Sequence, residues 1–367
     1  MTARGERVRD FTTADRQLDI VVDASRVYET LLGLFVYGEG RDAEYEDPGL
    51  FDRIEERLSP DLKAEITSAG SCWSVWLSLV ALASDHPAVR EVSAFTDLIR
   101  AMDPREVRRT MLACCGPPPL RNSDDETVMR VIEGETESLS EYLPEKYEGL
   151  RHVLAMEPVR SVEWLATTID RFYEEFMAAE LESSLPLLER EAAAQRTVAR
   201  TMPPDRFVEA ATHGITFELQ PNVSGILLIP SVVLRPWTVF TEKGTVRVFC
   251  YSLSDDQLTA DPAAPPGYLV EIYKALGDER RLKLLGLLAE ADADLRTLAD
   301  RVDVGKSTLH HHLRILRRAG LVRAVVGPDT HLYSLRKEGL SEAGPLLEGF
   351  LAARRTAGGP TDRNEKD

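Results

Sequence analysis

The sequence predicts an α+β fold, in which an α-rich N-terminal domain with a small β-sheet precedes a compact C-terminal domain. Apolar residues recur at helical spacing through most of residues 24–201, whereas β-branched and aromatic runs separated by Pro and Gly fill residues 214–253. A second group of short helical segments, followed by a hairpin pattern, begins at residue 268. With 367 residues, the chain has room for two or three domains.

The N-terminal part is predicted to be mainly helical. Residues 18–22 (LDIVV) favour a short strand, and residues 24–35 favour a helix with one apolar face. Residues 71–83 are apolar nearly all round, which predicts a buried central helix. Pro186 predicts a break or a kink within residues 161–200, because proline removes a hydrogen bond from a helix interior.

The domain boundaries follow changes in composition. Three or four strands are expected in a small sheet at about residues 214–253, and the Pro-rich stretch after them is typical of a linker. The polar, Gly-rich tail is expected to be disordered. The predicted segments are an uncharacterised α-rich domain (1–254), a linker (255–267), the C-terminal domain (268–355) and the tail (356–367).

The C-terminal domain begins with three predicted helices. Residues 269–276 carry apolar residues at helical spacing. Asp278 is placed to cap a second helix, on which Leu282 and Leu285 are in register. A third helix is predicted over residues 295–302, just before a short break in the pattern.

The most informative stretch of this domain is residues 303–320 (DVGKSTLHHHLRILRRAG). Its apolar face repeats at i, i+3, i+4 and i+7, while basic and hydrogen-bonding side chains occupy the other faces. The apolar face consists of Leu309, His312, Leu313 and Leu316. Gly320 is expected to end the helix. Two short helices joined by a tight turn predict a helix-turn-helix, whose second helix is the recognition helix.

A β-hairpin is predicted directly after this helix. The runs LVRAVV (residues 321–326) and HLYSL (residues 331–335) flank a Gly-Pro-Asp-Thr turn. This is the position of the wing in a winged helix-turn-helix. The sequence therefore predicts a winged helix-turn-helix as the C-terminal domain.

The C-terminal domain resembles a known family. The strings YKALGDERRLKLLGLL (residues 273–288) and STLHHHLRILRRAGLV (residues 307–322), followed by a hairpin that ends in YSLR, are similar to the winged helix of ArsR-type transcriptional regulators. The resemblance covers about residues 268–337. It implies a one-component bacterial regulator that binds double-stranded DNA. The preceding part resembles the uncharacterised domain of some such regulators, which supplies no ligand.

The resemblance also implies roles for individual residues. Early exposed positions of the recognition helix would face base edges, and later basic positions and the wing would meet phosphate. The implied base-contacting residues are Lys306, Ser307, His310 and His311. The implied backbone-contacting residues are Arg314, Arg317, Arg318 and Arg323, with Asp329 and Thr330 in the wing turn.

A homodimer is expected, because a single winged helix reads only a few base pairs. ArsR-type domains pair through their first and last helices, which implies contacts between residues 269–276 and residues 340–353. The implied apolar contacts of the last helix are Leu346, Leu347, Phe350 and Leu351.

Charge is divided unequally along the chain. Residues 271–338 carry 13 Lys and Arg against 10 Asp and Glu, a net charge of +3; the whole chain carries −17, so the remainder carries −20. Only the C-terminal domain is therefore suited to a polyanion. No run of 18 apolar residues is present and residues 1–19 are too charged for a secretory signal, so we expect a cytoplasmic protein with no membrane segment.

No metal or cofactor is expected. The three consecutive histidines at 310–312 point about 100° apart on a helix and cannot share one ion. ArsR-type metal sensors use cysteines in the first helix of the helix-turn-helix or Asp and His on a final helix. Residues 295–298 contain no cysteine, and residues 340–355 contain no histidine. Cys114 and Cys115 leave a soft-metal site as the alternative to a buried, reduced pair.

Two other classes of function stay open at this point. An enzyme fused to a DNA-binding module would need a nucleophile elbow, a phosphate loop or a His/carboxylate motif, and residues 1–255 carry none. A winged helix used for protein interaction would favour an acidic or apolar recognition face, whereas this face is basic. We therefore expect a non-enzymatic regulator controlled through its N-terminal domain. If a small-molecule effector exists, its expected site is the junction of the helical part and the sheet around Trp237.

Overall fold

The computed structural model describes most of the chain. The described residues are 18–39, 49–69, 73–121, 126–212, 215–217, 223–235, 237–253, 267–302, 304–326, 331–337, 339–341, 343–345, 347–348 and 351. Most of the predicted linker, the wing turn with Asp329 and Thr330, and the predicted tail lie outside the described residues.

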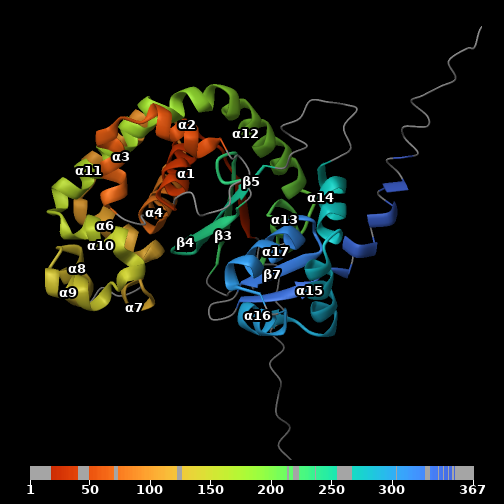
Figure 1. Cartoon of the computed structure of the whole chain (residues 1–367). Helices are drawn as coiled ribbons and strands as arrows, with labels where there is room; N and C mark the ends of the chain where they lie inside the picture. The colour runs from red at the N-terminus through yellow and green to blue at the C-terminus, as the bar shows by residue number, and fades with distance from the viewer. Residues whose placement is uncertain are drawn as a thin grey trace, which may run out of the picture.

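Helices of the N-terminal part form an arc, with α1 and α4 on its inner side (Figure 1). Their bounds are α1 (Arg26–Glu39), α2 (Leu50–Arg57), α3 (Pro60–Ser68), α4 (Trp73–Ser84), α5 (Val92–Ala101), α6 (Pro104–Cys115), α7 (Pro118–Arg121), α8 (Glu126–Ile132), α9 (Thr136–Tyr142), η1 (Glu145–Tyr147), α10 (Glu148–Ala155), α11 (Pro158–Phe172), η2 (Tyr173–Met177), α12 (Ala178–Ala199) and α13 (Pro204–Ala211).

Caps and prolines determine where several of these helices begin. Asp103 caps α6 and Glu157 caps α11, each through side-chain oxygens that accept backbone N–H bonds, and a proline follows each cap. Of the break or kink predicted at Pro186, the break is wrong, because α12 continues through this residue. Leu181 and Leu188 on either side are buried in the core, so packing holds the helix despite the lost hydrogen bond. The irregular turn is instead η2, a π-helical turn before α12.

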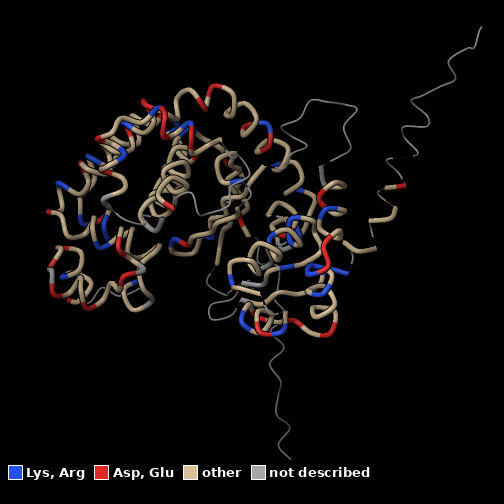
Figure 2. Tube along the Cα trace, in the orientation of Figure 1, with Lys and Arg blue, Asp and Glu red and all other residues tan. Residues whose placement is uncertain are grey.

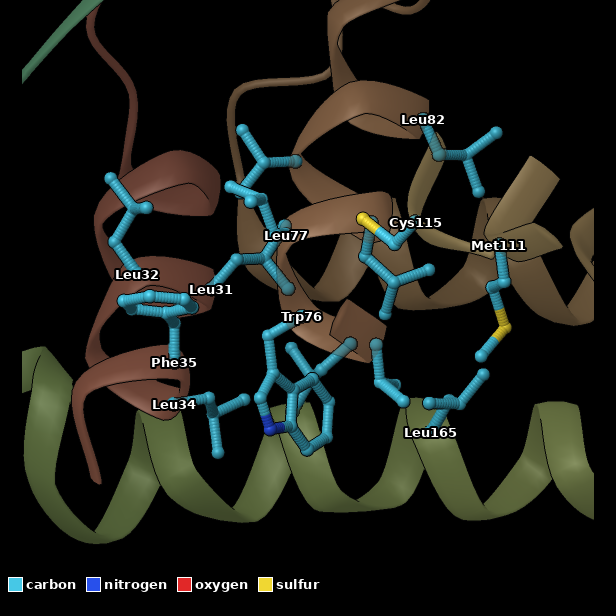
Figure 3. Packing of buried hydrophobic residues seen from close by; sticks show 14 of the residues in the cluster. Leu31, Leu32, Leu34, Phe35, Trp76, Leu77, Leu82, Met111, Cys115 and Leu165 are labelled. Atoms are coloured by element: carbon cyan, nitrogen blue, oxygen red, sulfur yellow. The ribbon is translucent and has the colours of Figure 1, made fainter. Parts of the chain in front are cut away.

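The predicted central helix is confirmed as α4. Residues 75–83 are all buried, and the Trp76 side chain has no exposed surface. Figure 3 shows Trp76 close to Leu34 of α1 and above the helix that carries Leu165. The indole rings of Trp76 and Trp164 stack with their centroids 5.9 Å apart. These tryptophans therefore form core, as large aromatic side chains commonly do.

The cysteines that the structure describes are also core residues. Cys114, Cys115 and Cys250 are buried and free. Burial raises the pKa of the Cys115 thiol to about 12, so the thiol stays protonated. Among the described residues, no group of three or more His, Cys, Asp and Glu side chains is arranged to hold a metal ion. No described helix is both long and apolar enough to cross a membrane.

Two four-stranded sheets lie beside the helical arc. In the first, the order is β1-β3-β5-β4: β1 (Asp19–Val22), β3 (Gly225–Ser231), β5 (Val246–Ser252) and β4 (Val239–Lys243). β1 and β5 are parallel to β3, and β4 is antiparallel to β5. In the second, the order is β2-β7-β8-β6: β2 (Ile215–Phe217), β7 (Val322–Val326), β8 (His331–Leu335) and β6 (Ala293–Asp294).

The second sheet joins the N-terminal part of the chain to the C-terminal winged helix. The sequence suggested that residues 215–220 belong to the same sheet as the strands after them, but β2 pairs in parallel with β7 instead. Ile215 lies opposite Ala324 in this register. β2 therefore covers the edge of β7, the first strand of the wing, which would otherwise present unpaired backbone groups.

The predicted winged helix-turn-helix is present at the C-terminal end. Its helices are α14 (Gly267–Leu276), α15 (Glu279–Glu290), α16 (Leu295–Val302) and α17 (Lys306–Arg318), followed by the hairpin β7–β8. The predicted cap is confirmed, since the Asp278 side chain accepts from the backbone N–H of Arg280 and Arg281. Of the apolar residues predicted in register on α15, Leu285 and Leu288 are buried, together with Leu284. Leu282 differs from the expectation, because it is 50% exposed. The protein has a helix-rich α+β fold, as predicted.

Candidate nucleic-acid interface

Glycines mark the beginning and the end of helix α17. Gly305 provides its N-cap position, and Gly320 adopts φ +66°, a conformation that glycine reaches without strain. The N–H of Leu321 donates to the carbonyl of Leu316 at 2.9 Å, and that of Gly320 donates to the carbonyl of Arg317 at 2.9 Å. This pair of bonds is a Schellman motif. The predicted stop at Gly320 is confirmed.

The apolar face of α17 packs into the core of the winged helix. Leu309, Leu313 and Leu316 have at most 1% of their surface exposed. His312 is 6% exposed, and neither of its ring nitrogens has a partner among the described residues. Burial lowers the pKa of His312, which favours the neutral imidazole. The expectation that His312 is a packed core residue is therefore confirmed.

The N-terminal turns of α17 are open to solvent. Lys306, Ser307 and His310 are exposed, whereas His311 is half-buried. Nδ1 of His311 lies 2.9 Å from Nη2 of Arg314. The four predicted base-contacting residues thus lie on the first turns of one helix.

The middle of α17 is covered by the N-terminal part of the chain. The guanidinium of Arg314 lies over the indole ring of Trp237, 4.5 Å from its centroid, in a cation–π contact. Trp237 comes just before β4, so its position is set by the first sheet. The sequence singled out Trp237 only as a possible pocket residue. It contained no signal that the partner is the recognition helix.

A buried carboxylate fixes the backbone that leads to Trp237. Glu29 of α1 accepts the N–H bonds of Val232 and Val233 at 2.9 and 3.0 Å. Burial raises the pKa of Glu29 to about 6, although these two hydrogen bonds lower it. The N–H of Trp237 in turn donates to the carbonyl of Leu234 at 2.6 Å. The indole is therefore held by a connected segment that starts in the core.

The remaining predicted arginines already have neighbours in the structure. Arg317 is partly buried beside Tyr333, and burial lowers the pKa of its guanidinium. Arg318 pairs with Glu271 of α14. Arg323 donates from Nε to Oε1 of Glu209 at 2.5 Å, which joins the wing to α13.

Glu209 makes a third contact between the two parts that the sequence did not reveal, after the β2–β7 pairing and the Trp237–Arg314 stack. Its side chain is 7% exposed, and Arg336 of the wing also approaches it, with Nε 3.5 Å from Oε1. Arg206, one turn earlier on α13, lies 3.5 Å from its other oxygen. A single Glu in a short helix has no sequence pattern that would identify such a role.

Helix α17 carries one lysine, three arginines and no Asp or Glu. In the rest of the winged helix, as along the helical arc, acidic and basic positions are mixed (Figure 2). The structure brings the predicted residues together on α17 and the first strand of the wing. It divides them into an exposed group at the start of α17 and a covered group from Arg314 onward.

Comparison with known proteins agrees with this geometry. A family model for bacterial regulatory proteins of the arsR family matches residues 278–324, which extend from the cap of α15 into β7. The transcriptional activator HlyU of Vibrio cholerae is 36% identical over 66 residues, 18% of this chain and 61% of that protein. An uncharacterised HTH-type transcriptional regulator of Methanocaldococcus jannaschii is 44% identical over 55 residues, 15% of this chain and 62% of that protein.

A further relative is matched over most of its length. The uncharacterised HTH-type transcriptional regulator YceK of Bacillus subtilis is 31% identical over 100 residues, 27% of this chain and 87% of that protein. The crystal structure of an ArsR family transcriptional regulator matches with a TM-score of 0.21 and 23% identity, covering 26% of this chain and 99% of that chain. The chain spans about three fifths of the length of the first two relatives. Through its C-terminal winged helix-turn-helix, the chain belongs to the ArsR family of bacterial transcriptional regulators.

Proposed function

We propose that this regulator binds double-stranded DNA as a homodimer through α17 and the wing, and that its N-terminal part controls binding by covering α17. The observation that carries the proposal is the stacking of Trp237 on Arg314. His310, Arg314 and Arg317 follow each other at i, i+4 and i+7, so they share one face of α17. A duplex that uses this face must displace Trp237.

The distribution of charge along the chain also supports control of DNA binding by the N-terminal part. The residues outside 271–338 carry a net charge of −20, which would repel a DNA duplex held close to them. The contacts of Glu209 with Arg323 and Arg336 place a carboxylate where the wing would meet phosphate. In the covered arrangement the protein therefore has weak affinity for DNA, and release of the N-terminal part restores it.

The proposed roles of the exposed and covered residues differ. Lys306, Ser307, His310 and His311 contact base edges in the major groove. Arg314, Arg317 and Arg323 contact the DNA backbone once the N-terminal part is displaced, and Arg318 contacts it in exchange for its pair with Glu271.

A homodimer is supported by the apolar surface of the winged helix. Tyr273, Leu282, Leu340 and Leu351 are 41%, 50%, 37% and 52% exposed. Tyr273 also donates from its hydroxyl to the carbonyl of Ala343 at 3.1 Å, so α14 lies against the residues that follow the wing. Leu346 and Phe350, expected at the same interface, lie outside the described residues. Sedimentation equilibrium should give twice the chain mass at micromolar concentration, and a monomer that still binds operator would contradict this.

The covering is tested by changing Trp237 in the full chain. A site is first selected from random-sequence duplexes, and fluorescence anisotropy then measures affinity for it. Trp237→Ala removes a contact worth about 0.5–2 kcal/mol, so it should tighten DNA binding by about 2- to 30-fold. Trp237→Phe keeps an aromatic face for Arg314 and is the matched control. Equal affinities for the wild type and Trp237→Ala would refute the proposal.

A further inference from the structure

We propose that a cavity between Trp237 and α17 is a binding site for a small oxyanion, of the size of phosphate or a short carboxylate. The cavity has a volume of about 170 Å³. Its lining includes Trp237, Thr238, His310, Arg314, Arg317 and Tyr333. None of the described residues that line it is Asp or Glu. The proposed site shares Trp237 with the effector site expected from the sequence, but it faces α17 instead of the helical part.

Arg317 supplies the main argument for an anion. Its Nε is shielded from solvent and has no hydrogen-bond partner among the described residues. A guanidinium withdrawn from water without a counter-charge is costly. The other covered arginines of this domain differ, since Arg318 pairs with Glu271 and Arg323 with Glu209. Arg317 therefore lacks the compensation that its neighbours have, and an anion in the cavity would provide it.

The other donors around the cavity suit the same ligand. Nε1 of Trp237 is buried and has no partner in the described part of the chain. The guanidinium of Arg314 closes one side by lying on the Trp237 ring. Thr238 and Tyr333 also line the cavity, and each carries a hydroxyl that is able to donate. Guanidinium groups bind carboxylate and phosphate through paired N–H donors, which makes these oxyanions the matching chemical class.

The size of the cavity limits the ligand. A water molecule occupies about 30 Å³ of liquid, so 170 Å³ holds about five or six groups of that size. Phosphate or a short carboxylate fits this space.

The regulatory consequence rests on the proposed function, whereas the binding itself does not. An anion held by Arg317 and Arg314 on one side and by Trp237 on the other stabilises the covered arrangement. Linkage then weakens DNA binding by the factor 1 + [L]/Kd, about elevenfold at a concentration ten times the dissociation constant. DNA phosphates compete for the same arginines.

The test uses the full chain without DNA and follows its four tryptophans by fluorine NMR after incorporation of 5-fluorotryptophan. Inorganic phosphate and acetate are titrated separately into the millimolar range at constant ionic strength, adjusted with chloride. At least one anion should move the Trp237 resonance saturably while the Trp76 resonance stays in place. Trp237→Phe assigns the signal. Absence of a saturable shift with both anions would overturn the proposal.

Variants distinguish binding of the anion in the cavity from nonspecific attraction to the positive charge of the domain. Arg317→Gln should weaken the anion by about tenfold or more, and Arg317→Lys should restore part of the affinity. Arg301→Gln, which changes an exposed arginine of α16 that pairs with Glu290, is the charge-matched control and should leave affinity unchanged. An unmoved Trp76 signal reports that the variants are folded. A shift that persists in Arg317→Gln would refute the site.

The two proposals fail in distinguishable ways. If phosphate or acetate shifts the Trp237 resonance but Trp237→Ala does not change DNA affinity, the anion site is supported and the covering of α17 is refuted. If Trp237→Ala tightens DNA binding but neither anion shifts the resonance, the covering of α17 is supported and the anion site is refuted.

Discussion

Replacement of Glu209 by glutamine should release the wing and tighten DNA binding. The Glu209 carboxylate is 7% exposed, and it accepts from Nε of Arg323 at 2.5 Å while Arg336 lies 3.5 Å away. Hydrogen bonds to charged groups contribute about 1.5–3 kcal/mol, and a glutamine retains an acceptor oxygen. We therefore expect the covered arrangement to lose about 1–2 kcal/mol, which corresponds to about 5- to 30-fold tighter DNA binding.

The assay needs a control for the change in net charge, because removal of any negative charge favours DNA binding. Glu180→Gln supplies it. Glu180 also bridges two arginines, Arg53 and Arg57 at 3.2 and 3.1 Å, but all three lie within the helical arc. Anisotropy titrations at one salt concentration should show tighter binding for Glu209→Gln than for Glu180→Gln. Equal affinities of the two variants would refute the reasoning.

Two further predictions concern stability and base recognition. Burial raises the pKa of Glu29 to about 6 from an ordinary 4.5, so the folded state binds this proton more tightly than the unfolded state. The contribution of Glu29 to the free energy of unfolding is therefore fully present below pH 4.5 and is lost as the pH rises through 6. At pH 7.5 this contribution is lower by about 2 kcal/mol. Urea unfolding should show that Glu29→Gln loses this dependence, and an unchanged dependence would contradict the assignment. His310→Ala should alter preference at one base pair by about 1–3 kcal/mol in selection from random duplexes, whereas an unaltered selected motif would remove His310 from the base contacts.

The winged helix was predictable because its signals are local. Asp278 lies next to the amides it caps, and Gly320 ends α17 through bonds that reach back only to Leu316. The apolar stripe of α17 repeats within a few turns. Such features are contained in short windows of sequence, so periodicity and cap chemistry identify them. Leu282 shows the limit, since it has the same spacing as the buried Leu285 but is itself 50% exposed.

The junction could not be predicted, because its contacts join distant parts of the chain. Three residues of β2 carry no information about which strand edge they will pair with, and β7 lies about 100 residues later. Trp237 and Arg314 meet only once both domains are folded. The helix does not break at Pro186 because burial of its neighbours, which the local sequence does not reveal, outweighs the penalty of proline in α12. The sequence thus predicts the DNA-reading helix but not what covers it.

The most direct test of the central claim is the environment of the Trp237 ring before and after operator DNA is added to the full chain. In a 5-fluorotryptophan sample, the shift of the Trp237 resonance between H₂O and D₂O reports its exposure to solvent. Our account predicts a small isotope shift in the free protein, where Arg314 covers the ring, and a larger one in the DNA complex, with Trp76 unchanged in both. A Trp237 resonance that keeps the same position and isotope shift at saturating operator would contradict the account, because the recognition helix would then bind DNA while still covered.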